Sequence, residues 1–155
     1  MDESEELTAL HPNHVKVLRV ATAIATIPFV IGSLVLEFAG LLPTGVLIVP
    51  VLLVAALAIV RAPLRRYAAR GYVMGEDRLR VVRGLWFRLD TVVPFGRVQH
   101  IDVDQGPLER AYGLATLTLH TAGNHNASVA LPGLADADAR AMRETIRARI
   151  RRDTM

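Results

Sequence analysis

The chain contains no cysteine, which excludes disulfide bonds and thiolate metal sites. Other marks of catalytic proteins are missing as well. No serine stands in a recognisable nucleophile elbow, and no glycine-rich phosphate loop is present. The sequence therefore carries no strong signature of a thiol, acyl-transfer or nucleotide-binding enzyme.

Charge is also scarce over one long stretch. The 155 residues are 52% hydrophobic, and the mean hydropathy of +0.32 is high for a soluble domain. Between Arg19 and Arg61 the single charged residue is Glu37. One membrane span takes roughly 20 apolar residues, so this stretch is long enough for two. We predict a transmembrane helical hairpin over residues 15–62, with helices at about 16–38 and 45–62 and a turn at Leu42-Pro43-Thr44-Gly45.

Two alternatives to a membrane hairpin fit poorly. A buried hairpin in a soluble protein would have to be enclosed by the roughly 90 residues that follow it. A signal peptide begins with basic residues, whereas this chain begins MDESEEL. We predict that residues 1–14 form a disordered acidic N-terminus.

Within the predicted hairpin, Pro28 and Pro50 are expected to kink the two helices. Glu37 is expected near the outer interface, too shallow for an ion relay.

Basic residues flank the hairpin on one side only. Lys16 and Arg19 precede it, the turn between the helices has no Lys or Arg, and four arginines follow it: Arg61, Arg65, Arg66 and Arg70. The positive-inside rule then predicts that both termini are cytoplasmic.

Charge divides the chain in the same way. Residues 1–60 hold two basic and five acidic residues, a net charge of −3, whereas residues 61–155 hold sixteen basic and ten acidic residues, a net charge of +6. A basic domain beside the hairpin is attracted to the anionic lipids of an inner leaflet. Nucleic acid is not expected as a partner, because no binding motif appears and the basic residues are dispersed.

Residues 63–155 change from helical to alternating periodicity. Strands are expected at 71–74, then where Leu79 and Val81 face inward, then where Phe87 and Leu89 face inward. Further strands are expected at 98–104, 115–121 and 127–131, with a turn at 122–126 and a break at Pro132-Gly133. An amphipathic helix, with Met142, Ile146 and Ile150 along one face, ends the chain. This predicts a mainly-β domain of antiparallel strands with one small core.

The run RVQHIDVDQGPLERAYGLATLTLHTAG, residues 97–123, concentrates the polar residues of this domain. Pro107 suits the first position of a short helix over 108–112, and Gly113 suits its C-terminal end. Gln99 shares the inward phase of Ile101 and Val103, which folding alone does not explain.

This run, preceded by a helical hairpin and by strands such as DRLRVVRGLW, resembles the bacterial membrane proteins of the YdbS type, which carry a PH-like domain called bPH2. The resemblance extends from about Arg61 to Arg151. It implies a PH-like fold, a bent antiparallel sheet or barrel capped by a C-terminal α-helix and tethered to the bacterial cell membrane. It brings no catalytic residues with it.

An enzyme is the first functional hypothesis. His100, Asp102 and Asp104 lie on one strand face, and His120 or His125 could join them in a metal or His–carboxylate site. The same alternation places polar residues on the wet face of any half-exposed strand. We therefore predict no enzyme, no cofactor and no metal ligand.

Lipid contact is the second hypothesis. Trp86 lies beside a chain reversal at Gly84, and both Trp and Arg suit the bilayer interface. Covering the edge of the core is the alternative role for Trp86. No dense basic cluster in one loop indicates a phosphoinositide pocket. The candidate lipid contacts are Arg61, Arg65, Arg66, Arg70, Arg83, Trp86 and Arg88.

A protein-interaction module is the hypothesis we favour, because tethering to a membrane raises the effective concentration of a domain for partners on the same surface. Candidate partners are other membrane proteins, a related PH-like protein among them, and the expected setting is a membrane complex or an envelope-stress role. Alternatively, the edge of the last strand and the groove beside the helix would accept a peptide. The candidate interaction surface is Arg97, His100, Asp102, Gln105, Glu109 and Arg110.

Overall fold

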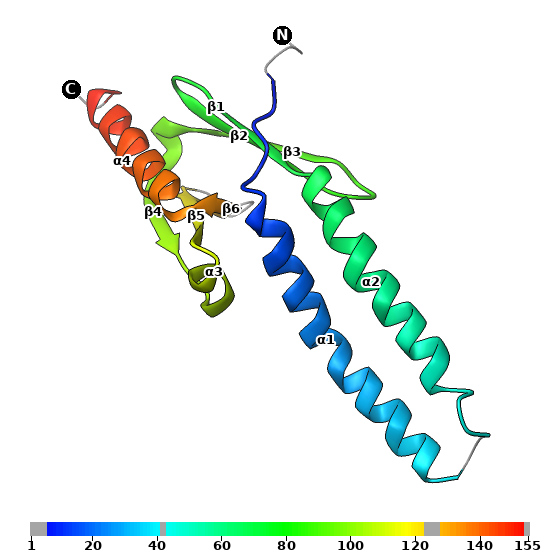
Figure 1. The fold of residues 1–155 in the computed structure, drawn as a ribbon. Helices are drawn as coiled ribbons and strands as arrows, with labels where there is room; N and C mark the ends of the chain where they lie inside the picture. The colour runs from blue at the N-terminus through cyan, green and yellow to red at the C-terminus, as the bar shows by residue number, and fades with distance from the viewer. Residues whose placement is uncertain (1–5, 41–42, 123–127, 154–155) are drawn as a thin grey trace. The chain divides into compact units, whose positions relative to one another are not determined.

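The computed structural model describes residues 6–40, 43–122 and 128–153 (Figure 1). They divide into two compact units. One unit is the helical segment Val15–Arg66, and the other combines the residues up to His14 with those from Tyr67 onward.

Two long apolar helices make up most of the first unit, as predicted. Helix α1 spans Asn13–Phe38 and helix α2 spans Ile48–Ala68. Each contains an 18-residue window of high mean hydropathy, 1.9 and 2.0, of which only 6% is buried. Pro28 lies inside α1, whereas Pro50 lies in the first turn of α2, where a missing N–H breaks no helical hydrogen bond. Both helices are therefore long and apolar enough to cross a bilayer. Leu42, from the predicted turn, lies outside the described residues.

The first sheet is antiparallel and consists, in spatial order, of β1 (Gly71–Met74), β2 (Arg78–Arg83) and β3 (Leu89–Pro94). Its core face carries Leu79 and Val81, as predicted, because both are buried. The prediction for β3 was wrong: Phe87 precedes the strand with 89% of its surface exposed, and Leu89 is also exposed. The strand register pairs Leu79 with Val93, so Val93 supplies the buried side chain of β3.

The second sheet is antiparallel and consists, in spatial order, of β4 (Val98–Asp104), β5 (Leu114–Thr121) and β6 (Ser128–Ala135). It contains two irregularities. A bulge between Val98 and His100 takes Gln99 out of phase, so Gln99 is exposed and its predicted inward position was wrong. A 3-10 turn, η1 (Phe95–Arg97), leads into this sheet. The short helix α3 (Pro107–Ala111) connects β4 to β5.

The second irregularity lies in β6. Leu117 pairs with Leu131, but Ala115 pairs with Leu134, so β6 holds one extra residue at Pro132-Gly133. We predicted that these two residues break the strand, and this was wrong, because the chain accommodates them as a bulge and continues to Ala135. The predicted turn at 122–126 lies, apart from Ala122, outside the described residues.

Helix α4 (Asp136–Asp153) packs on the core through the face predicted from its periodicity. Met142 and Ile146 are buried, and Ile150 is partly buried against the same cluster. Phe95, Leu117 and other apolar side chains of both sheets fill that cluster. The described residues thus form a PH-like fold, in which the two three-stranded sheets and the helix share one core without closing into a barrel.

The segment before α1 belongs to this domain. Thr8 forms an isolated bridge with Tyr72, and the side chain of Leu10 is 3% exposed. The backbone N–H of His11 donates to the carbonyl oxygen of Gly133 over 2.8 Å. The disorder predicted for residues 1–14 was therefore wrong from Thr8 to His14, because these residues add hydrogen bonds and apolar surface to the β domain. Residues 1–5 lie outside the described residues.

Candidate functional site

The polar face of strands β4 and β5 brings two histidines together on one carboxylate. His100 and His120 are cross-strand neighbours, and Asp102 lies two residues from His100 on the same face. His100 Nε2 lies 2.8 Å from Asp102 Oδ1, and His120 Nε2 lies 3.2 Å from Asp102 Oδ2. The side chain of His100 is 70% exposed, so solvent screens this cluster.

This histidine–carboxylate cluster does not resemble a metal centre. Among the described residues, no group of three or more His, Asp or Glu side chains is arranged to hold a metal ion. Asp104 is exposed at the end of β4, and His125 lies outside the described residues. What the geometry supplies is one solvated carboxylate in contact with two imidazoles on a sheet face.

Two of the predicted interaction residues instead hold the turn around α3. The Glu109 carboxylate accepts the backbone N–H of Gly106 over 2.9 Å and the hydroxyl of Thr116 over 2.7 Å. Gln105 Nε2 donates to the carbonyl oxygen of Leu114 over 2.7 Å. Glu109 thus satisfies the N–H at the N-terminus of the short helix, and Gln105 satisfies a carbonyl at the start of β5, so both side chains have a structural role.

Arg97 and Arg110, from the same predicted surface, are exposed. The carbonyl oxygen of Arg97 accepts the N–H of Ala122 over 3.2 Å, but within the described part of the chain no carboxylate forms a salt bridge with either arginine. Of the six predicted interaction residues, three are exposed and three are half-buried. The exposed ones are Arg97, His100 and Arg110, and the half-buried ones are Asp102, Gln105 and Glu109.

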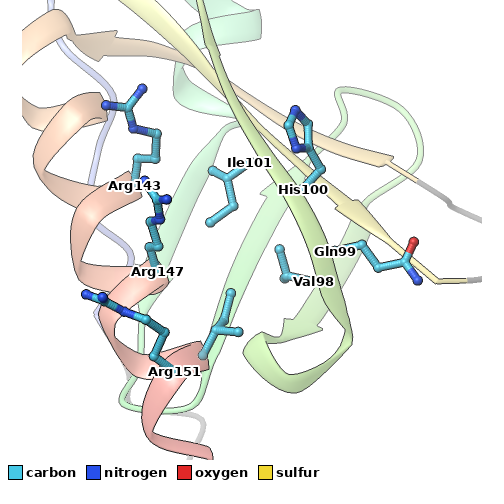
Figure 2. Close-up of a pocket in the computed structure, with 8 residues that line it drawn as sticks. Val98, Gln99, His100, Ile101, Arg143, Arg147 and Arg151 are labelled. Atoms are coloured by element: carbon cyan, nitrogen blue, oxygen red, sulfur yellow. The ribbon is translucent and has the colours of Figure 1, made fainter. Parts of the chain in front are cut away.

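A groove lies between strand β4 and helix α4 (Figure 2). It has a volume of about 450 Å³. One side is formed by four consecutive residues of β4, Val98 to Ile101, and the other by three arginines and Ile150 of α4. Figure 2 shows the arginine side chains along the helix beside the groove; they are Arg143, Arg147 and Arg151.

The connection between β2 and β3 exposes large apolar side chains. Trp86 and Phe87 are 86% and 89% exposed, and Leu85 is 44% exposed. Trp86 therefore does not cover the edge of the core.

An ion pair lies at the base of this hairpin. Arg80 Nε lies 3.0 Å from Asp90 Oδ1, and this hydrogen bond to the guanidinium holds the pKa of the Asp90 carboxyl below its usual value.

The predicted basic lipid contacts are placed as follows. Arg88 is exposed next to Phe87, and Arg83 is half-buried at the end of β2. Arg70 follows α2, and its guanidinium lies 3.4 Å from Nε2 of the buried His14. The remaining three are exposed on the last turns of α2: Arg61, Arg65 and Arg66.

Two apolar helices followed by a PH-like domain define a membrane-anchored PH-like protein. The chain matches the family model of the bacterial PH domain over residues 15–150, and it belongs to that family. This confirms the resemblance drawn from the polar run and its flanking strands.

One curated relative supports the membrane location. The chain is 32% identical over 84 residues to the UPF0699 transmembrane protein YdbS of Bacillus subtilis (strain 168). These 84 residues cover 54% of this chain and 51% of that protein. The match thus spans about half the length of the relative. No solved structure matches the chain. The relative's name and the two apolar helices together indicate a membrane protein.

Sequence analysis missed the arginines that line the groove. Arg147 and Arg151 were recognisable as part of the polar face of the last helix, and Arg143, Arg147 and Arg151 repeat at the four-residue interval that aligns side chains on a helix. The pattern does not show which strand lies opposite the arginine row, because only the packing of α4 brings this row to the edge of β4.

Proposed function

We propose that this chain is a non-enzymatic interaction module, which its helical hairpin anchors in the bacterial cell membrane with both termini in the cytoplasm. The PH-like domain then presents its binding surface to other membrane proteins at the inner leaflet. The groove between β4 and α4 is the observation that carries this proposal, because it combines an open strand edge with a positively charged wall. Arg97, His100 and Arg110 are proposed to extend the surface around it.

Crosslinking in the native membrane, followed by purification in mild detergent, tests this proposal. We expect a specific membrane protein to co-purify with the unmodified chain and to be lost from Arg147→Glu, which reverses a groove charge. Arg140→Glu is the matched control, since Arg140 is exposed on the same helix and pairs with Asp136 outside the groove.

The proposal fails if no partner depends on this surface. That result would be a set of co-purifying proteins unchanged by Arg147→Glu and also by charge reversal at Arg97 and Arg110. A measured catalytic turnover would likewise contradict the non-enzymatic assignment.

Contact with lipid is a second candidate function, and the exposed hairpin tip favours it. Trp86 and Phe87 lie side by side in the chain and are almost fully exposed, with Arg88 next to them. Indole rings prefer the membrane interface, and arginine pairs with phosphate there. Burying this tip in the interface would remove its apolar surface from water.

The single tryptophan of the chain makes this testable by fluorescence. We expect the emission of the full-length protein to be quenched in vesicles of brominated phospholipids, and quenched more when part of the lipid is phosphatidylglycerol. Arg88→Gln should reduce that difference between anionic and neutral lipid. Emission typical of a water-exposed indole, unchanged by brominated lipid, would exclude insertion of the tip.

A further inference from the structure

Strand β4 is the edge strand of its sheet, and it borders the groove. It pairs with β5 on one side, and in the sheet order nothing among the described strands pairs with its other side. Four consecutive residues of β4 line the groove, rather than alternate ones. The bulge at Gln99 interrupts the alternation of side chains in this run. Because β4 is the outer strand of its sheet, the N–H and C=O groups on its open edge have no partner among the described strands.

The side of the groove formed by α4 is positively charged, and its arginines are regularly spaced. Arg143, Arg147 and Arg151 follow each other at intervals of four residues, and four residues of an α-helix rise about 6 Å. Arg143 contacts Glu144 over 3.0 Å, whereas no carboxylate of the described residues forms a salt bridge with Arg147. Among the described residues, no acidic side chain lines the groove.

Part of the lining of the groove is apolar. Val98 is 8% exposed, and Ile101 and Ile150 are partly buried. A ligand in this groove can therefore place apolar atoms against these side chains while it meets arginine on one side and open backbone groups on the other.

An extended peptide matches all three features of the groove, which are the open strand edge, the row of arginines and the apolar side chains. In a β-strand, alternate side chains lie on the same face about 6.8 Å apart, close to the rise between neighbouring arginines of the row. A strand added to β4 would bond through its main chain and direct every second side chain toward α4. Acidic residues at alternate positions would meet the arginines, as charge complementarity requires.

We propose that the groove between β4 and α4 binds an extended acidic segment of another protein, as a strand added to the edge of β4. This inference rests on the proposed function, and it names the chemistry of the partner. A lipid headgroup would meet the arginines but would leave the strand edge without hydrogen-bond partners, so the peptide fits the groove better.

A synthetic peptide provides the direct test. The probe is Thr-Glu-Thr-Glu-Thr-Glu-Thr, with capped ends and a fluorescent label, titrated with the full-length chain in nanodiscs of neutral lipid. A peptide of the same composition, Thr-Thr-Glu-Glu-Glu-Thr-Thr, is the control for charge alone. We expect the alternating peptide to bind on the order of tenfold more tightly, a difference of about 1.4 kcal/mol.

Two protein variants locate the binding. Arg147→Glu should weaken binding of the alternating peptide on the order of tenfold or more, because an attraction becomes a repulsion in the groove. Arg140→Glu changes the net charge equally but outside the groove, and should leave the affinity unchanged. Equal effects of both variants would show nonspecific attraction and overturn the proposal.

Backbone methylation tests the added strand. Two versions of the peptide carry N-methyl groups either on every threonine or on every glutamate. Only alternate N–H groups of a strand face its neighbour, so one version should lose binding and the other should keep it. If both versions bind as well as the parent peptide, no strand is added. If phosphatidylglycerol in the nanodisc displaces the peptide and Arg147→Glu abolishes this displacement, the groove is a lipid site instead.

These outcomes separate the inference from the function on which it rests. A membrane partner that depends on Arg147, together with a failure of the peptide to bind, would leave the interaction module intact and remove the acidic strand. Absence of any Arg147-dependent partner would remove the module itself.

Discussion

Two phenylalanines show how differently one residue type can act in this domain. Phe95 is 0% exposed, and the guanidinium carbon of Arg149 lies 5.9 Å from the centroid of its ring. Phe87, eight positions earlier, is 89% exposed. From the sequence, Phe87 looked like an inward residue of the third strand. Their true roles depend on where β3 begins, which a pattern of alternation does not fix.

Replacing each phenylalanine by alanine should separate these roles. We expect Phe95→Ala to lower the free energy of unfolding of the domain by about 3–5 kcal/mol, because a large buried ring leaves a cavity. Phe87→Ala should change it by less than about 0.5 kcal/mol, since an exposed side chain loses little packing. Hydrogen–deuterium exchange of the β5 amides in the full-length protein measures both. Comparable losses would contradict the burial assigned to Phe95.

At the scale of the elements, local irregularities decide what the sheets can do. The bulge at Gln99 and the bulge at Pro132-Gly133 each shift the alternation by one residue. Gly133 has a φ of +77° and lies against the ring of His14. Gly113, after helix α3, has a similar φ of +69°, as predicted for the end of a short helix, but open space around it.

This similarity makes the two glycines a matched pair. A Cβ added at Gly133 would lie 2.6 Å from Cγ of His14, whereas at Gly113 it would meet nothing within 4 Å. Gly113→Ala should therefore cost only the backbone strain, about 1–2 kcal/mol, and Gly133→Ala should cost clearly more. Thermal unfolding of the full-length variants gives the comparison.

The clash itself can be tested by a second substitution. In a His14→Ala background the additional cost of Gly133→Ala should fall to that of Gly113→Ala, because the ring is gone. If the additional cost does not change, contact with His14 is not the reason for glycine at this position.

Sequence analysis recovered the elements that depend on one strong periodic signal. The two apolar helices, the inward face of β2 and the buried face of α4 all follow from repeated apolar spacing. It failed where one residue is inserted, at Gln99 and Gly133, and where contact partners are distant in sequence, as for Leu10. The arginine row belongs to the second kind, because its meaning depends on β4, some 45 residues earlier.

At the scale of the whole molecule, the lack of cysteine allows the membrane topology to be measured directly. Thr44→Cys places the only thiol between α1 and α2, and Glu76→Cys places it in the exposed turn between β1 and β2. We expect a membrane-impermeant maleimide, added to intact cells, to label Thr44→Cys but not Glu76→Cys, as two cytoplasmic termini require. Labelling both after lysis is the control. The opposite pattern in intact cells would invert the proposed orientation.

The hydrogen bonds of Thr8 and His11 to the β domain mean that the chain enters this fold, leaves it at α1, and re-enters it after α2. In topological terms the membrane hairpin is an insertion into a discontinuous domain. A chain shortened to residues 63–155 would therefore lack part of its own core, including Leu10. Tyr67 Oη donates to the carbonyl oxygen of Leu10 over 2.6 Å, so the two pieces meet close to the insertion points. Replacing residues 15–66 by a short flexible linker should yield the complete domain without its membrane anchor.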